Sequence, residues 1–473
     1  MIQSSACSEV LCRVHGVPEF NVLRESSERN NHKKTSLLLN IFWDNSVFNG
    51  NKKIAMNLLG ASIFIIAILL FSTFLNWYVF QAVKTLSQQI SIERTRNTVQ
   101  ILYWLVFGGI SLWYVYTFLK VFITGEFTLS TQTLLNVFLT VVVTQLVCVI
   151  FLFSEDIYRN AYAGFAYLSK NRDSFSFPPR KFWISAVAVM VAMIPFFGFL
   201  YGMSFGKHNF KLHREVLYFE DLPEAFDGFT ITQISDIHIG SFKNPDHVQK
   251  GIDMVLAQES DLFVFTGDLV NHRADEIDPF ISLFSEIKAP YGQYSIIGNH
   301  DYGDYIPWPS KEAKEANFQL FLDKHKELGF KLLRDEGIRI EKDGSFIQLL
   351  GVENWGVGFG SRGDLERALE QTAVEDFKIL LSHDPSHWDQ QVKTHEMGIH
   401  LTLSGHTHGM QFGIETPIIR WSPVQYRYPN WAGLAEHEGR FLYVNRGFGF
   451  HAFSGRVGIW PEITVIELRR KKL

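Results

Sequence analysis

Five groups of polar side chains each follow directly after an apolar run of strand length. Their carboxylate, amide and imidazole groups suit divalent metals such as Mn, Fe or Zn better than Ca. One such group alone would indicate little, but five in the same position relative to a strand indicate a shared metal centre. They are Asp236-Ile237-His238, Gly267-Asp268, Gly298-Asn299-His300-Asp301, His383-Asp384 and Gly405-His406-Thr407-His408.

The chemistry of such a centre follows from its ligand types. A carboxylate at the end of a central strand, such as Asp268, can bridge two metal ions about 3.5–4 Å apart. Two ions at that spacing would bind a phosphoryl group, and a bridging water would lose its proton and become the nucleophile. Glycines beside Asp268, Asn299 and His406 let the backbone come close to the ions. The pattern therefore predicts a two-metal hydrolytic centre.

The elements that must position these groups alternate between strand and helix from about Arg214 onward. In open α/β sheets ligands bind beyond the carboxyl ends of the strands, so the five groups are expected at one rim. The alternation predicts an α/β domain of about 260 residues. Expected strands are Gly228–Ser235, Leu262–Thr266, Tyr294–Ile297, Phe346–Leu350, Phe377–Leu381, Leu401–Leu403, Phe441–Val444 and Glu462–Leu468, with helices over Pro245–Gln258, Glu312–Leu328 and Leu365–Thr372.

The part of the chain before this domain contains four apolar stretches long enough to cross a bilayer. None of them contains Asp, Glu, Lys, Arg or His, which favours an anchor over a transporter. Asn136, Thr140 and Gln145 in the third stretch are expected to form hydrogen bonds between helices. The stretches are Ile54–Leu75, Ile101–Leu119, Leu134–Phe153 and Phe182–Phe205.

Composition narrows the class of protein further. The 473 residues are 15% aromatic and 20% charged, which excludes a disordered chain, a collagen and a coiled coil. The net charge of −5 gives no basic footprint for nucleic acid. Cys7, Cys12 and Cys148 all precede the α/β part, so no disulfide framework is expected there.

Three segments are predicted: 1–53 as a disordered extension, 54–206 as four transmembrane helices and 207–473 as the catalytic domain. Met56 is a candidate true start, because the first residues are polar and aperiodic. Without the extension, eight Lys and Arg residues in the loops between spans one and two and between spans three and four oppose four on the other side. The positive-inside rule then places the catalytic domain outside the cytoplasm, whereas counting the extension makes the two sides equal.

The five motifs, in their order along the chain, resemble the calcineurin-like metallophosphoesterase superfamily, and the resemblance covers about Glu215 to Leu468. The segments Ser235-Asp236-Ile237-His238-Ile239-Gly240 and Pro461-Glu462-Ile463 are most similar to its bacterial membrane-associated branch, which includes UDP-2,3-diacylglucosamine pyrophosphatase-type phosphoesterases. The resemblance implies a four-layer α/β/β/α sandwich of two mixed sheets and a location in the bacterial cell membrane.

The resemblance also implies roles for individual residues. His300 would protonate the leaving oxygen as the general acid, and Asp301 would orient that imidazole. Every position of the family's metal-binding set is filled. One metal would be held by Asp236, His238, Asp268 and His408, and the other by Asp268, Asn299, His383 and His406.

Several positions keep two interpretations. Arg446 and Arg456 either bind a substrate phosphate or form structural ion pairs. The aromatic stretches Tyr302–Trp308 and Trp421–Trp431 either face the substrate or cover the core, and the second could rest on lipid headgroups. Met410 stands where the family commonly has a second glycine. The remaining histidines, among them His451, are interpreted as structural, and His272, four residues after Asp268, is the exception nearest to the rim.

The sequence therefore predicts a membrane-anchored hydrolase of phosphomonoester, phosphodiester or pyrophosphate bonds that uses two divalent ions, Mn, Fe or Zn, and a hydroxide bridging them. Its expected partners are a phosphorylated small-molecule or lipid-linked substrate and membrane lipids, with no nucleic-acid readout. The alternative is a non-catalytic membrane receptor or scaffold that binds a phosphorylated ligand at the metal site. The intact His300–Asp301 pair favours the enzyme, since binding alone needs no proton donor.

Overall fold

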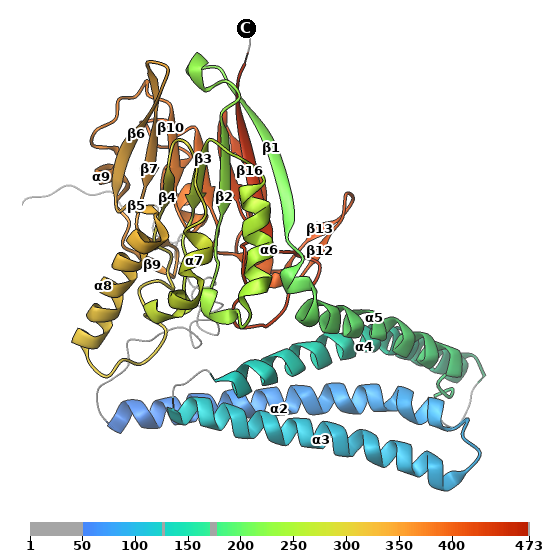
Figure 1. Ribbon diagram of the computed structural model, residues 1–473. Coiled ribbons are helices and arrows are strands. Elements are labelled where there is room, and N and C mark those ends of the chain that lie inside the picture. Colours follow the sequence, from blue (N-terminus) through green and yellow to red (C-terminus); the bar gives the residue numbers. More distant parts are fainter. Residues whose placement is uncertain (1–50, 125–127, 171–176, 472–473) are drawn as a thin grey trace, which may run out of the picture. The chain divides into compact units, whose positions relative to one another are not determined.

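The computed structural model describes residues 51–124, 128–170 and 177–471, which Figure 1 colours along the chain. The chain divides into two units, Met1–Phe64 and Ile65–Leu473. In the first unit the described residues belong to the start of helix α2, and the second unit contains the remaining elements. The predicted disordered extension lies outside the described residues except for its last three, which are part of α2.

Among the described residues, four helices are long and apolar enough to cross a membrane, as the sequence predicts. Gln145 connects two of them, because its Nε2 donates to Asn76 Oδ1 at 2.6 Å. Thr140 instead bonds within its own helix, to Asn136 O at 2.7 Å. These helices are α2 (Asn51–Ser87), α3 (Glu93–Thr124), α4 (Leu129–Lys170) and α5 (Phe182–Ser204).

The α/β part contains two six-stranded mixed sheets, in agreement with the predicted fold class (Figure 1). The first has the order β1-β16-β2-β3-β4-β5 and the second β14-β15-β11-β10-β7-β6. In the first sheet β2, β3 and β4 run parallel to one another, and in the second β7, β10, β11 and β15 do so.

The first sheet is built from β1 (Lys211–Phe219), β2 (Thr230–Ile234), β3 (Leu262–Phe265), β4 (Gln293–Ser295), β5 (Lys331–Leu332) and β16 (Glu462–Arg470). The second is built from β6 (Glu336–Lys342), β7 (Ser345–Gly351), β10 (Lys378–Leu381), β11 (Leu401–Ser404), β14 (Gly433–His437) and β15 (Arg440–Val444). Two small hairpins pair β8 (Trp355–Gly356) with β9 (Gly360–Ser361) and β12 (Ile414–Glu415) with β13 (Arg420–Trp421). The helices are α6 (Pro245–Leu256), α7 (Ile281–Phe284), α8 (Lys311–Leu328) and α9 (Leu365–Leu369).

Alternation along the strands produces four layers. Leu262 and Val264 of β3 point into a core shared with strands of the second sheet, such as Leu381 of β10. Phe263 and Phe265 of the same strand point the other way, into a core that also contains apolar residues of α6, α7 and α8. On the outer face of the second sheet, residues of α9 pack on β7, β10 and β15. The arrangement is helix, sheet, sheet, helix, as predicted.

The strands that the sequence analysis missed lie mostly at the edges. β1, β5, β6 and β14 occupy outer positions of the two sheets. In β1 (Lys211–Phe219) and β6 (Glu336–Lys342) most residues are at least partly exposed, and few are buried. β5 has only two residues. The central strands are buried along their whole length and were predicted within one or two residues of their bounds.

Candidate metal centre

The five predicted groups meet where the two sheets present the carboxyl ends of their parallel strands. Asp236 and His238 follow β2, Asp268 follows β3, and Asn299 follows β4, all in the first sheet. The second sheet supplies the remaining three, from the ends of β10 and β11. These three are His383, His406 and His408.

The structure brings the first predicted ligand set together. The Nε2 atoms of His238 and His408 lie 3.0 Å apart. His408 Nε2 is 3.3 Å from Asp236 Oδ1, and His238 Nε2 is 3.5 Å from Asp268 Oδ2. All four side chains are buried. Four lone-pair donors at such distances can surround one cation.

The second predicted set converges on the other side of Asp268. His383 Nε2 lies 3.2 Å from Asp268 Oδ2 and 3.2 Å from Asn299 Oδ1. His406 Nδ1 is 2.9 Å from Asn299 Oδ1 and 3.3 Å from His383 Nε2. Asp268 Oδ2 is therefore common to both sets, which is the position of a bridging ligand.

The backbone at this centre is held in an uncommon conformation. Side chains other than glycine rarely adopt positive φ, and such residues cluster at functional sites. Glycine is also required nearby, because a Cβ at Gly298 would lie 2.2 Å from Asp268 Oδ1. Five of the seven candidate ligands have positive φ: Asp236 (51°), His238 (47°), Asp268 (61°), His406 (71°) and His408 (49°).

Neighbouring groups orient the donor atoms. Asn299 Nδ2 donates to Tyr305 Oη at 2.8 Å, which turns the amide oxygen toward the centre. His383 Nδ1 lies 2.7 Å from Thr266 O, so Nδ1 carries the proton and Nε2 keeps a lone pair. His406 has the other tautomer, with the proton on Nε2 and the lone pair on Nδ1. Such outer hydrogen bonds fix the tautomer that a metal requires.

Tyr428 connects His406 to a buried carboxylate. Its hydroxyl donates to Asp384 Oδ2 at 3.1 Å and accepts from His406 Nε2 at 3.0 Å. The Nδ1 atom of His406 is thereby left with a lone pair facing Asn299 and His383. Asp384 and Tyr428 were not among the predicted site residues.

The charges of the centre fit a cation. Although burial alone would lower it, the carboxylates of Asp268 and Asp236 raise the pKa of His383 to about 10. Burial and repulsion by Asp268 raise the pKa of Asp236 to about 6. Burial, together with the charge of Arg456, lowers the pKa of His408 well below its usual range, so that this ring is neutral, as a metal ligand must be. The carboxylates thus attract positive charge to the centre, and a bound metal cation would displace the second proton of the His383 ring.

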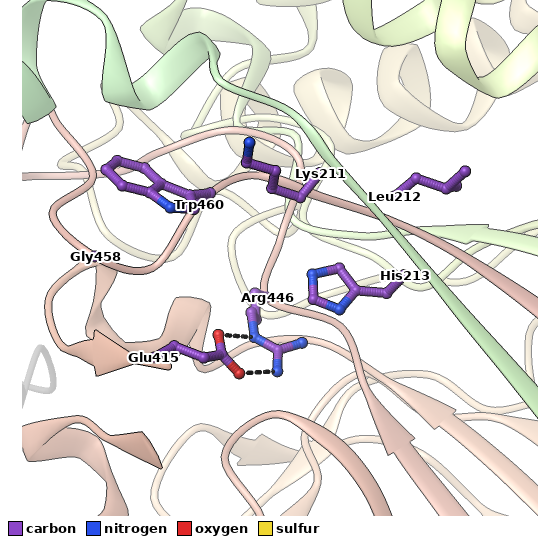
Figure 2. A pocket seen from close by; sticks show the side chains of 7 residues that line it. All are labelled: Lys211, Leu212, His213, Glu415, Arg446, Gly458 and Trp460. Carbon is purple, nitrogen blue, oxygen red and sulfur yellow. Dashed lines mark hydrogen bonds and ion pairs between the residues drawn. The ribbon is translucent and has the colours of Figure 1, made fainter. Parts of the chain in front are cut away.

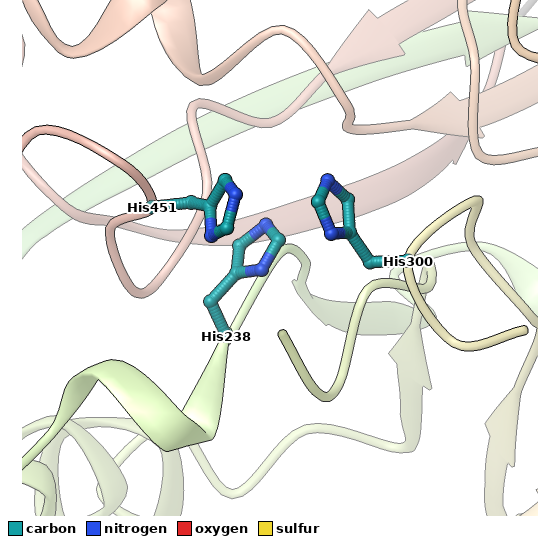
Figure 3. A group of neighbouring side chains, drawn as sticks. All are labelled: His238, His300 and His451. Atoms are coloured by element: carbon teal, nitrogen blue, oxygen red, sulfur yellow. The ribbon is translucent and has the colours of Figure 1, made fainter. Parts of the chain in front are cut away.

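His300 lies beside the first ligand set, next to a histidine that the sequence analysis interpreted as structural. Its ring is 4.9 Å from the ring of His238 and 4.5 Å from that of His451, measured between centroids (Figure 3). Asn271 forms hydrogen bonds with both His300 and His451. Its main-chain oxygen is 2.9 Å from His300 Nδ1, and its Oδ1 is 3.1 Å from His451 Nδ1. His451 therefore belongs to the site. The signal that could have found it is its place after β15, which runs parallel to β11 in the same sheet.

Asp301 does not have the role predicted for it, because the group at His300 Nδ1 is the carbonyl of Asn271. The carboxylate of Asp301 instead accepts hydrogen bonds from backbone N–H groups of the loops after β3 and β4. Burial, followed by repulsion from Asp268, raises the pKa of Asp301 to about 8. Asp301 thus joins two ligand-bearing loops. The donors are Gly298 (2.8 Å), Asp268 (3.0 Å), Leu269 (2.8 Å) and Val270 (3.2 Å).

Arg446 forms structural ion pairs, one of the two interpretations that the sequence allowed, whereas Arg456 forms hydrogen bonds with main-chain carbonyls in place of an ion pair. Arg446 pairs with Glu462 at 2.5 Å and with Glu415 at 2.5 Å, and the second pair lines a hollow that also contains Trp460 (Figure 2). Arg456 is fully buried and donates to the carbonyl oxygens of Gly449 (2.8 Å) and Gly447 (3.0 Å).

The two aromatic stretches are divided between both interpretations. In the first, Tyr305 contacts Asn299 and lies 4.5 Å from the His300 ring, whereas Tyr302 is buried and donates to Glu353. In the second, Tyr428 reaches His406, while Tyr426 is 80% exposed. The ring of His272 lies 5.8 Å from that of His300, close to the site.

Comparison with known proteins supports the same assignment. A family described as "Probable Calcineurin-like phosphoesterase, transmembrane domain" matches residues 61–207, and one described as "Calcineurin-like phosphoesterase" matches residues 229–410. The chain is 30% identical over 277 residues to "Uncharacterized metallophosphoesterase YkuE" of Bacillus subtilis, which covers 58% of this chain and 90% of that protein. It is 28% identical over 264 residues to "Transmembrane protein with metallophosphoesterase domain" of Danio rerio, covering 53% of this chain and 55% of that protein. The match thus spans about half the length of the vertebrate relative.

Proposed function

The chain belongs to the calcineurin-like phosphoesterase family, and from that premise we propose that it is a membrane-anchored hydrolase of phosphomonoester, phosphodiester or pyrophosphate bonds. The observation that carries this proposal is the position of Asp268 Oδ2, which lies 3.2 Å from His383 and 3.5 Å from His238 and so joins two donor sets. Two divalent ions held there, Mn, Fe or Zn, would activate water and neutralise charge on the phosphoryl group.

The protein's own residues supply the remaining parts of the reaction. In hydrolysis a water oxygen binds phosphorus, and the bond from phosphorus to the leaving oxygen breaks. His300 donates at Nδ1 to the Asn271 carbonyl, so a second proton on this ring is carried at Nε2. We assign that Nε2 proton to the departing oxygen. The proton lost by the attacking water passes to solvent, and solvent returns a proton to the ring at Nε2.

The arrangement around the centre favours turnover over binding alone. The alternative, a receptor or scaffold that holds a phosphorylated ligand, has no use for a buried imidazole beside the ligand sets. The substrate we propose is lipid-linked, since four apolar helices anchor the chain in a membrane. Its phosphoryl group would be the part that reaches His300 and the two ligand sets.

The test is hydrolysis by the full chain purified in detergent. Bis-aryl phosphate, aryl phosphate and UDP-diacylglucosamine are offered with added Mn²⁺ or with a chelator. We expect metal-dependent release from at least one of them, lost in Asp268→Asn and in Asn299→Ala. Asp323→Asn, at an exposed acid on α8, is the matched control. Two bound metals by elemental analysis with no turnover of any of the three would favour the receptor.

We also propose that the α/β domain lies on the extracytoplasmic face. The loops joining α2 to α3 and α4 to α5, with the adjoining helix ends, carry Lys84, Arg94, Arg159 and Arg180 among their basic residues. Basic loops stay in the cytoplasm. The test is labelling of a Val374→Cys variant in intact cells by a membrane-impermeant maleimide, because Val374 is an exposed residue of the α/β domain. Protection of this cysteine until the cells are lysed would reverse the assignment.

A further inference from the structure

The β12–β13 hairpin presents apolar side chains to its surroundings. At its turn Ile418 is 93% exposed and Ile419 53% exposed, and Ile414 and Met410 before it are also exposed. Single exposed apolar residues are common on proteins, but a run of them in one segment indicates a surface that meets something apolar.

The base of this hairpin lies against a membrane-spanning helix. Phe412, two residues before β12, stacks on Phe199 of α5 with 5.4 Å between ring centroids, and Phe453 packs on the same ring at 5.5 Å. Phe199 precedes the end of α5 at Ser204 by five residues. At a rise of 1.5 Å per residue it therefore lies about 7–8 Å inside the span. The base of the hairpin is thus at the depth of the bilayer edge.

The residues near that helix end are those that favour the headgroup region of a bilayer. Trp460 lies 5.9 Å from Tyr201 of α5, measured between ring centroids. The hollow beside Trp460 is lined by Lys211, an exposed cation (Figure 2). The carboxylate that lines the same hollow, Glu415, is already paired with Arg446. Trp, Tyr and Lys are typical of the membrane–water interface.

The loop that follows the candidate ligand His408 carries an exposed apolar side chain. Met410 has φ of 54°, in the left-handed region that favours glycine, and its side chain is 59% exposed. It follows His408 by two residues and precedes the hairpin. His408, Gly409 and Gln411 also have positive φ, so the conformation belongs to the whole loop, and Met410 differs from these neighbours in its exposure. Along the chain, exposed apolar side chains thus recur from two residues after His408 to the hairpin turn, at Met410, Ile414, Ile418 and Ile419.

We propose that the β12–β13 hairpin inserts into the lipid bilayer in which α5 ends, with Ile418 and Ile419 among the acyl chains and Lys211 near the headgroup phosphates. Insertion itself does not depend on hydrolysis. Its consequence rests on the proposed function: a lipid whose acyl chains lie against Ile414 and Met410 can present its phosphoryl group to the metal centre without leaving the membrane surface.

The experiment measures the depth of the hairpin in a bilayer. The full chain, with Cys7→Ser, Cys12→Ser and Cys148→Ala, receives Ile418→Cys labelled with an environment-sensitive fluorophore. It is reconstituted into vesicles of phosphatidylcholine and phosphatidylglycerol, some of which carry a spin label on the acyl chain. Val374→Cys, at an aliphatic residue 61% exposed between α9 and β10, is the matched control. Both positions are exposed, so neither substitution should prevent folding.

We expect acyl-chain quenching at position 418 to exceed that at position 374 by about twofold or more, since an inserted side chain reaches the acyl boundary. Equal quenching at both positions, with aqueous iodide reaching both labels, would overturn the insertion. That result is the one expected if the hairpin binds another protein and stays outside the bilayer. Hydrolysis of bis-aryl phosphate, aryl phosphate and UDP-diacylglucosamine is scored separately, and release from any one of them counts as hydrolysis. A deeply placed label without hydrolysis contradicts the proposed function alone, and hydrolysis with an aqueous label contradicts the insertion alone.

Discussion

The backbone N–H of Arg456 donates to the carbonyl oxygen of Gly202 in α5 at 3.2 Å. The guanidinium of the same arginine lies 3.2 Å from Nδ1 of His408, one of the candidate metal ligands. One residue therefore contacts both a membrane-spanning helix and the metal centre. The close approach depends on glycine, because a Cβ at position 202 would lie 2.5 Å from Arg456 O.

Gly202→Ala is expected to weaken metal binding. The added methyl displaces the Arg456 backbone and with it the guanidinium beside His408. Because Arg456 donates toward His408 Nδ1 and accepts nothing from it, the expected loss comes from a displaced His408 ring and is about tenfold in metal affinity. The measurement is metal affinity of the purified chain by competition with a chelating dye. Gly198→Ala is the control, because a Cβ there would be 3.7 Å from Val457, an ordinary contact. Equal affinities in both variants would show that the contact with α5 does not reach the centre.

Tyr428→Phe is expected to lower metal affinity by about tenfold, the lower range for outer-sphere partners of metal ligands. The variant removes the acceptor for His406 Nε2, so that the ring can take the tautomer with a proton at Nδ1. Tyr426→Phe is the control, because Tyr426 is two residues away and its side chain is 80% exposed. A metal content and affinity equal to the parent chain would mean that His406 keeps its tautomer without Tyr428.

The sequence predicted which candidate ligands come together, because its signal is local. Each candidate ligand directly follows a buried strand, and parallel strands bring their carboxyl ends to one edge. The edge strands β1 and β6 were missed because most of their residues are partly or fully exposed and several are charged, a composition that is also typical of loops.

The roles of single side chains depended on partners that local sequence does not reveal. Arg446 and Arg456 have the residue type of a phosphate ligand, but Glu415 and Glu462 approach the first from separate strands. Asp301 follows His300 in sequence, yet its carboxylate points to the loop after β3. His451 has no motif around it, and its ring reaches His300 because the loop after β15 is hydrogen-bonded to the residues after β2, for example from Gly449 N to Asp236 O.

His451→Ala is expected to lower kcat/KM by about tenfold, the effect of one lost hydrogen bond to a charged substrate group, while metal affinity stays within about twofold. Asn271 holds His451 and His300 by their Nδ1 atoms, so both rings face the same side of the first ligand set. His437→Ala, on the edge strand β14, is the control. A large loss of metal with unchanged kcat/KM in the reloaded protein would make His451 a ligand-supporting residue and contradict this role.

Glu462→Gln is expected to remove a pH-dependent part of the stability. Glu462 is fully buried, and although burial would raise it, the charge of Arg446 lowers its pKa from 4.5 to about 2. A carboxyl whose pKa is lowered on folding stabilises the protein above its unfolded value and loses that effect as the pH falls from about 4.5 toward 2. The shift corresponds to about 3 kcal/mol at neutral pH.

In the presence of chelator, the free energy of unfolding of the variant should be lower at pH 7 and approach that of the parent chain in acid. Glu467→Gln, in a half-buried pair with Arg469 on the same strand, should change it by less than about 1 kcal/mol. Parallel pH profiles of the parent and Glu462→Gln would contradict the assignment of this acid dependence to the Arg446–Glu462 pair.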